Sequence, residues 1–99
     1  MTGYQLSEQA RNDIRSIWRQ IAADSHQGAD RVVDCLVASC DFLGTFPVEG
    51  EPWPGRPPGL RYYPVPRTRY LIVFVPLTDP VDIVAVIDGT RNLDNVSLA

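Results

Sequence analysis

The stretch "YLIVFVPLTDPVDIVAVI", residues 70–87, decides the fold of this chain. Two runs rich in β-branched residues, Tyr70–Val75 and Val81–Ile87, flank the turn signal "PLTDP", a pattern that is typical of a β-hairpin. Because both runs are hydrophobic almost without interruption, both faces of these strands are expected to be substantially covered. The hairpin therefore predicts a sheet with other parts of the chain packed against it.

Upstream of the hairpin, the sequence predicts two amphipathic helices. Ser7 is suited to be the N-cap of the first helix, whose apolar residues recur every three or four positions and which should end near Asp24. After the turn segment "DSHQG", a second apolar stripe runs from Ala29 to Leu43. Two such helices joined by a few residues form an antiparallel hairpin with one shared apolar side.

The rest of the chain adds two shorter strands and a loop. Tyr4–Leu6 is a candidate strand, and so is Leu60–Val65, which Pro64 confines to a sheet edge or a bulge. Eight of the thirteen residues in Pro47–Gly59 are Pro or Gly, so no regular element is expected there. The predicted class is α+β: an N-terminal strand, an antiparallel helical hairpin and a three-stranded, mainly antiparallel sheet, in one domain over residues 1–99.

The composition excludes several classes of protein. No apolar run approaches the roughly 20 residues that cross a bilayer, and the first residues do not form a signal peptide, so a cytoplasmic protein is expected. Cys35 and Cys40 are five residues apart on a predicted helix, about 140° around its axis, and cannot easily bridge each other. Both are expected to be buried or nearly buried thiols. No metal site and no cofactor are predicted.

Familiar catalytic patterns are missing, including a Gly-rich phosphate loop, a nucleophile elbow and paired metal ligands. His26 is expected in the solvated turn between the helices, and Asp79 and Asp82 are expected to be turn and edge charges. Asp88 precedes "GTR" and is suited to cap the turn that leaves the last strand.

Arginines at spacings of four should form a solvated stripe along the first helix. They are expected to lie within reach of Glu8 and Asp13. The arginines are Arg11, Arg15 and Arg19.

The remaining arginines are concentrated in one part of an acidic chain. The protein has nine Arg, no Lys and twelve Asp or Glu, a net charge of −3. Residues 52–78 contain Arg56, Arg61, Arg67 and Arg69 and no carboxylate, a local charge of +4 that leaves −7 elsewhere. An uninterrupted strand would place Arg67 and Arg69 on the same face, where they would bind phosphate or a carboxylate-rich partner. In the alternative interpretation, these arginines pair with acids on the helices.

Four segments together resemble the ParE/RelE superfamily of bacterial toxins, which are the toxin halves of type II toxin–antitoxin modules and are often labelled plasmid stabilisation proteins. The resemblance runs from about Tyr4 to Leu93, and its specificity lies in the order of the segments. They read "LSEQARNDIRSIWRQIA", "FLGTFPVEG", "GLRYYPVPRTRYLIVFVP" and "IVAVIDGTRNL". The fold that the resemblance implies, two helices on a curved antiparallel sheet, agrees with the one predicted from the residues.

The resemblance implies two divergent activities. ParE-like members inhibit DNA gyrase by binding it, and the first helix, with Trp18 and "QIA", looks more like this branch. RelE-like members cleave messenger RNA on the ribosome. In a ribonuclease, Arg67, Arg69 and Arg91 would stabilise the phosphate, and the candidate proton donors would be Tyr62, Tyr63 and Tyr70. An Arg cannot readily act as a base, because its pKa exceeds about 12, so no catalytic residue is firm.

The favoured interpretation is a ParE-like toxin neutralised by an acidic, partly disordered antitoxin that folds on binding. The protein would form a homodimer or a hetero-oligomer with the antitoxin. Its binding residues would be Arg61, Arg67, Arg69 and Arg91, with Arg91 approaching the others from the tail. Changing each to Gln should then cost function more than folding. A third interpretation is an antitoxin-binding homologue without toxicity. It is motivated by the net charge of −3 and by Ala85 and Asp88, which stand where the resemblance implies basic or titratable residues.

Overall fold

The structure, a computed structural model, describes residues 3–52 and 59–90. Two helices and five strands lie in these residues, which confirms the predicted α+β class. In chain order they are β1 (Tyr4–Leu6), α1 (Glu8–Ala22), α2 (His26–Thr45), β2 (Glu51–Pro52), β3 (Arg61–Pro64), β4 (Tyr70–Val75) and β5 (Val81–Asp88). No helix in the described part of the chain is both long and apolar enough to cross a membrane.

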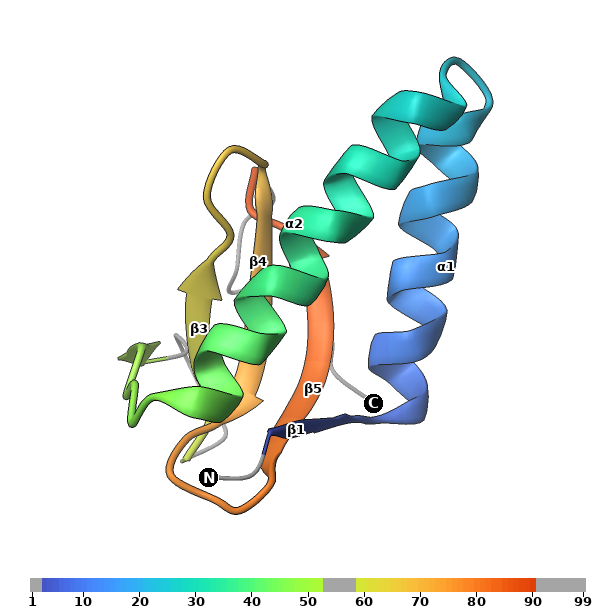
Figure 1. Cartoon of the computed structure of the whole chain (residues 1–99). Helices are drawn as coiled ribbons and strands as arrows, with labels where there is room; N and C mark the ends of the chain where they lie inside the picture. The colour runs from blue at the N-terminus through green and yellow to red at the C-terminus, as the bar shows by residue number, and fades with distance from the viewer. Residues whose placement is uncertain (1–2, 53–58, 91–99) are drawn as a thin grey trace.

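The five strands form one mixed sheet in the order β1-β5-β4-β3-β2 (Figure 1). The predicted hairpin is its centre, where β4 and β5 are antiparallel, and β1 adds to β5 in parallel, with Tyr4 opposite Val81. The expectation that Pro47–Gly59 holds no regular element is wrong, because Glu51 and Pro52 pair with β3. Pro52 is tolerated there because β2 is the outermost strand, where a missing N–H need not break a ladder.

Serine side chains begin both helices. The Ser7 hydroxyl oxygen accepts the Ala10 N–H at 2.9 Å, as predicted for an N-cap, and the Ser25 hydroxyl oxygen accepts the Gly28 N–H at 2.9 Å. The second cap starts α2 three residues before its apolar stripe. The placement of His26 in the interhelical turn is therefore wrong, since His26 is the first residue of α2.

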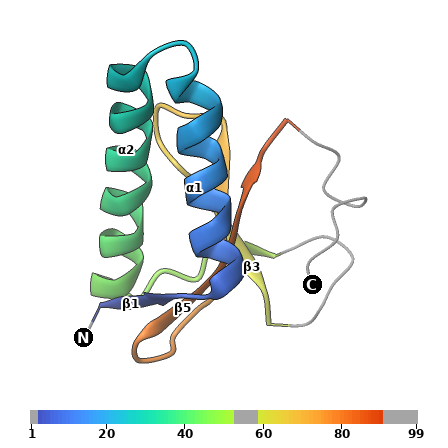
Figure 2. The ribbon, with the colours of Figure 1, turned by 90° about the vertical axis from the view of Figure 1, so that its right-hand side faces the viewer.

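Both helices lie on the same side of the sheet (Figure 2), and the main core is between the two layers. Its fully buried side chains, each at most 2% exposed, include Leu36, Cys40, Leu43, Ile72, Phe74 and Ile83. Cys35 is half-buried against this core, so both thiols are placed as predicted. The opposite face of the sheet carries a second cluster around Val73 and Ala85, each 0% exposed, in line with the expectation that both faces are covered.

Side chains from the start of α1 satisfy the outer edge of β5 beyond the end of β1. A register shift opposite Val73 and Phe74 leaves Val84 as an extra residue in β5. The Ser7 hydroxyl donates to the Val84 carbonyl at 2.7 Å, and the Asp13 carboxylate accepts the Val86 N–H at 2.9 Å. Asp13 therefore fixes the helix to the sheet. The sequence analysis placed it instead within reach of the α1 arginines, all three of which are exposed.

Candidate functional site

The arginine-rich window does not form one strand face. Residues 66–69 form the turn between β3 and β4, and Arg67 has a positive φ of 66° within it. The condition for Arg67 and Arg69 to share a strand face is not met, because no strand runs through either position. The turn nevertheless brings these two exposed side chains close together at one end of the sheet.

Arg61 is separated from the turn by the length of β3. It is half-buried and lies opposite Phe74 in the ladder, on the face that the helices cover. The four residue steps from Phe74 to Tyr70 along β4 correspond to about 13 Å, so Arg61 is distant from Arg69. Arg91, the fourth predicted binding residue, lies outside the described residues.

Arg69 pairs with an acid, but not with a helix acid as the alternative interpretation expected. Its Nε atom is 3.2 Å from Oδ2 of Asp88 at the end of β5, with side chains 58% and 27% exposed. The other carboxylate oxygen of Asp88 accepts the Thr90 N–H at 2.9 Å and the Thr90 hydroxyl at 2.7 Å. This confirms the predicted capping role of Asp88. Asp88 therefore caps the end of β5 and connects it to the β3–β4 turn through the ion pair with Arg69.

Tyr70, one of the candidate proton donors of a ribonuclease, is 6% exposed and belongs to the main core. The guanidinium carbon of Arg69 lies over the Tyr70 ring, 5.6 Å from the ring centroid. A buried phenol cannot contact an RNA backbone, so Tyr70 and the turn arginines do not make a catalytic group in the described part of the chain. Nor do the described residues contain a cluster of three metal-ligating side chains.

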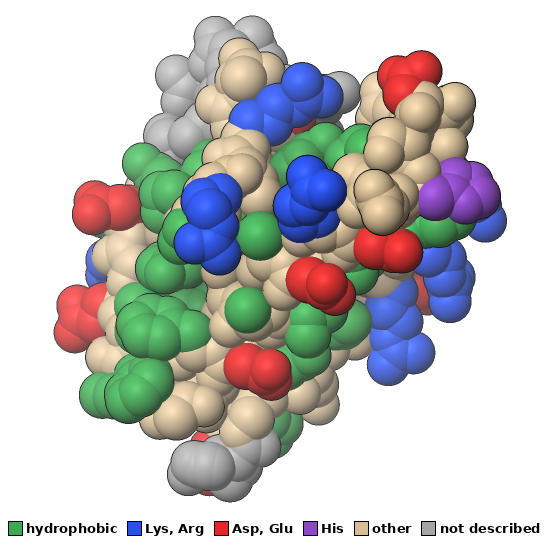
Figure 3. All heavy atoms as spheres, turned by 45° about the horizontal axis from the view of Figure 1, so that its top comes forward, with side chains coloured by type: hydrophobic (Ala, Val, Ile, Leu, Met, Phe, Trp, Pro, Cys, Tyr) green, Lys and Arg blue, Asp and Glu red, His purple; other side chains and the backbone are tan. Residues whose placement is uncertain are grey.

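The sequence analysis missed an aromatic surface between α2 and β3. The Phe42 and Phe46 ring centroids are 5.1 Å apart, and Phe42 is 5.7 Å from Tyr63 of β3. Phe42 and Phe46 remain 39% and 54% exposed. Figure 3 shows hydrophobic side chains near the C-terminal end of α2, with acidic side chains along the helix and basic ones toward the opposite end. The available signal was the i, i+4 spacing of two Phe residues beside the apolar stripe of α2.

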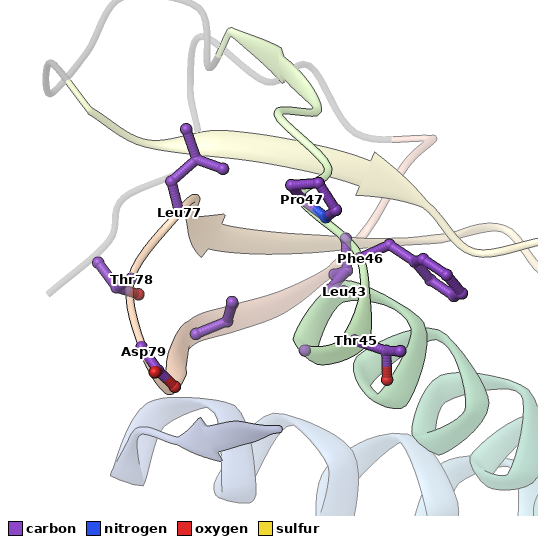
Figure 4. A pocket seen from close by; sticks show the side chains of 9 residues that line it. Leu43, Thr45, Phe46, Pro47, Leu77, Thr78 and Asp79 are labelled. Carbon is purple, nitrogen blue, oxygen red and sulfur yellow. The ribbon is translucent and has the colours of Figure 1, made fainter. Parts of the chain in front are cut away.

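A pocket of about 290 Å³ lies at the lower end of this surface, between the end of α2 and the β4–β5 turn (Figure 4). Leu43 and Val81 line its floor, while Phe46, Pro47 and Leu77 line its rim. Leu77 is 63% exposed and has a positive φ of 62°, a conformation that is uncommon for a side chain of this size. A large apolar residue in an exposed and strained position points to a role outside the core.

The described residues thus present an exposed aromatic surface beside a pocket, and exposed arginines in the β3–β4 turn, on a two-layer α+β scaffold. The family model of the ParE toxin of type II toxin–antitoxin systems (parDE) matches residues 4–93. The chain belongs to this family.

A solved structure has the same fold. It is described as the chromosomal ParDE toxin–antitoxin system from P. aeruginosa, and it is similar to this chain with a TM-score of 0.74 and 18% sequence identity. The similarity covers 89% of this chain and 96% of that chain. No curated protein matches the sequence.

Proposed function

We propose that this protein is a toxin that inhibits growth by binding its target and is neutralised by an antitoxin encoded beside it. The observation that carries the proposal is the contact between the exposed rings of Phe42 and Phe46, beside a pocket that the exposed Leu77 also lines, in a chain that belongs to the ParE toxin family. Monomeric soluble proteins rarely expose contiguous apolar patches without an interaction to serve. We expect the protein to act in the cytoplasm, in a hetero-oligomer with the antitoxin.

DNA gyrase is the proposed target, as the ParE-like resemblance implies. Burial of Tyr70, one of the three tyrosines named as proton donors for a ribonuclease, supports binding over RNA cleavage, while Tyr62 and Tyr63 are half-buried. Two of the three motives for a non-toxic homologue have structural reasons of their own, since Ala85 is fully buried and Asp88 caps a turn. The third motive, the net charge of −3, stands.

The test is expression of the protein without its antitoxin, with plasmid supercoiling and messenger RNA integrity followed together. The expected result is growth arrest and loss of negative supercoiling while messages stay intact, with reversal by the protein from the adjacent reading frame. Codon-specific message cleavage would instead establish the ribonuclease. Normal growth with confirmed soluble expression would establish the non-toxic homologue.

A further inference from the structure

Opposite charges form two rows on the outer side of the helical hairpin, which faces away from the sheet. At 100° per residue, the α1 row lies about 100–180° around the helix from the fully buried Ala10, and the α2 row about 100–140° from the fully buried Ala29. All six side chains are exposed, and Figure 3 shows the acidic ones along α2. The rows are Arg11, Arg15 and Arg19 on α1, and Asp30, Asp34 and Asp41 along the exposed crest of α2.

A hydrogen bond between the helices sets the register of the two rows. Trp18 Nε1 donates to Oδ1 of Asp30 at 2.9 Å, so the neighbouring Arg19 is level with Asp30 on the antiparallel helix. Each step of four residues is about 6 Å along either helix, which brings Arg15 level with Asp34. One step further, Arg11 is about 4–5 Å from the level of Asp41, a difference that a long arginine side chain spans.

The six charges do not neutralise one another within one copy of the chain. Among residues 3–52 and 59–90, none of the six takes part in an ion pair. Arg15 donates a hydrogen bond of 3.4 Å to the neutral Asn12, and Asp30 accepts the bond from Trp18. Val37, which is 40% exposed, lies on the flank of α2 that is turned toward α1. An exposed apolar side chain is thus flanked by two rows of opposite charge.

We propose that this surface, hereafter the charged face, binds a second copy of this chain around a two-fold axis that runs along the helical hairpin between α1 and α2. A rotation of 180° about this axis exchanges the two sides of the face and keeps each level unchanged. The arginine row of each copy therefore lies opposite the aspartate row of the other, as an isologous interface requires. Three ion pairs form twice each: Arg19 with Asp30, Arg15 with Asp34, and Arg11 with Asp41.

Charge selects this arrangement over the other two-fold docking. An axis that ran across the hairpin would place the arginine row opposite itself and the aspartate row opposite itself, and like charges across an interface oppose binding. With the axis along the hairpin, the two copies of Val37 approach each other near the axis. Phe42 lies about 220° around α2 from Ala29, so the aromatic surface stays uncovered in both copies.

The area of the charged face indicates a weak dimer. Helices of 15 and 20 residues are about 22 and 30 Å long, and two side by side are about 20 Å wide. Each copy therefore buries on the order of 500 Å², and the total of about 1,000 Å² is at the low end for a specific interface. The dimer exchanges with the monomer and depends on salt. This inference goes beyond the proposed function, since it needs neither the target nor the antitoxin.

The first test measures self-association of the purified full chain by sedimentation velocity from about 5 to 500 µM. A monomer–dimer equilibrium is expected at low salt. Raising the ionic strength from about 0.05 to 0.5 M should weaken it at least tenfold, because exposed ion pairs are screened. If the chain stays monomeric at every concentration, the charged face is solvated or serves a different partner. That result overturns the dimer and leaves the proposed function intact.

Two charge-reversal variants test the charged face itself. The acidic variant carries Arg11→Glu with Arg15→Glu, and the basic variant carries Asp34→Arg with Asp41→Arg. Each should self-associate at least tenfold more weakly than wild type, because one row then faces a row of its own sign. An equimolar mixture of the two variants should form a heterodimer, since the new carboxylates of one lie opposite the new guanidinium groups of the other.

A control variant separates contacts at the charged face from net charge. Gln20→Glu, Arg67→Glu and Thr78→Glu together change the net charge as much as the acidic variant does, at exposed positions outside the charged face. This variant should self-associate within about threefold of wild type and form no heterodimer with the basic variant. Because every substituted position is exposed, all variants should unfold close to the wild-type temperature.

The control and the mixture decide between the explanations. If the control loses self-association as completely as the acidic variant, net charge acts without the charged face and the proposal is overturned. A mixture of folded acidic and basic variants that stays monomeric overturns it as well, because the two rows then do not meet.

Discussion

Two cysteines five positions apart on α2 have different environments. Cys40 is 1% exposed within the main core, whereas Cys35 is half-buried on the flank beside β3. Burial, with a smaller effect from the charge of Asp41, raises the pKa of the Cys40 thiol from 9.0 to about 12. Burial also raises the pKa of Tyr4, to which the charges of Cys40 and Asp41 contribute. Both groups therefore keep their protons in the folded protein at pH values where an unfolded chain begins to lose them.

The free energy of unfolding should consequently fall as the pH rises above about 9. Between pH 9 and 12 the folded Cys40 thiol binds a proton that the unfolded thiol has released, so the unfolded state gains stability with rising pH. Urea denaturation from pH 7.5 to 10.5 measures the effect. Cys40→Ala should be less stable overall but show a shallower decline than wild type. Parallel curves for the two proteins would contradict the assignment.

At the scale of elements, α1 closes the sheet edge that the short strand β1 leaves open. β1 pairs with Val81, Asp82 and Ile83 only, and β5 continues to Asp88. The exposed edge beyond Ile83 would present unpaired backbone groups. Ser7 and Asp13 satisfy two of them, the Val84 carbonyl and the Val86 N–H. Side chains at the start of α1 thus make hydrogen bonds that a neighbouring strand would otherwise make.

Removing the Asp13 acceptor should destabilise the fold. Asp13→Ala leaves the partly buried Val86 N–H without its 2.9 Å partner, and an unsatisfied buried group costs about 1–3 kcal/mol. Asp34→Ala on the exposed crest of α2 is the matched control and should change the unfolding free energy by less than about 0.5 kcal/mol. Chemical denaturation of both variants checks the prediction. An Asp13→Ala protein as stable as the control would mean that water replaces the carboxylate.

The sequence predicted the elements well where the deciding interactions are between residues close together in the chain. Ser7 capped α1 and the "PLTDP" turn joined β4 to β5, both as expected from nearby residues. The errors came from tertiary context. Glu51 and Pro52 lie in a segment rich in Pro and Gly, and they pair only because β3 offers them an edge.

The site was less predictable than the fold. The arginines could be predicted because a charge window is visible without a structure, but their separation, with Arg67 and Arg69 in the turn and Arg61 in β3, could not. Phe42 and Phe46 were not predicted, since a helix pattern does not tell which flank meets a neighbouring strand. The contact with Tyr63, twenty-one positions from Phe42, became visible only in the folded chain.

At the scale of the whole molecule, the sheet is packed on both faces, and Ala85 lies in the smaller of the two clusters. Ala85 is 0% exposed beside Val73. The small neutral side chain therefore fits this protein's own packing.

Ala85→Arg should destabilise the protein by more than about 3 kcal/mol, because it places an uncompensated charge in a packed cluster. Gln20→Arg, at an exposed position on α1, is the control and should have little effect. Thermal unfolding of both variants measures the difference. If Ala85→Arg unfolds at the wild-type temperature, the second cluster is not a core.

The parallel pairing of β1 with β5 has a consequence for how the protein is made in the cell. Tyr4 is translated 77 codons before its partner Val81. Contacts between residues so distant in the chain form late, and until β5 is translated β4 lacks its antiparallel partner. A message cut or stalled between these two codons would therefore yield a fragment without the central hairpin, in which β1 and β4 both lack the strand that lies between them.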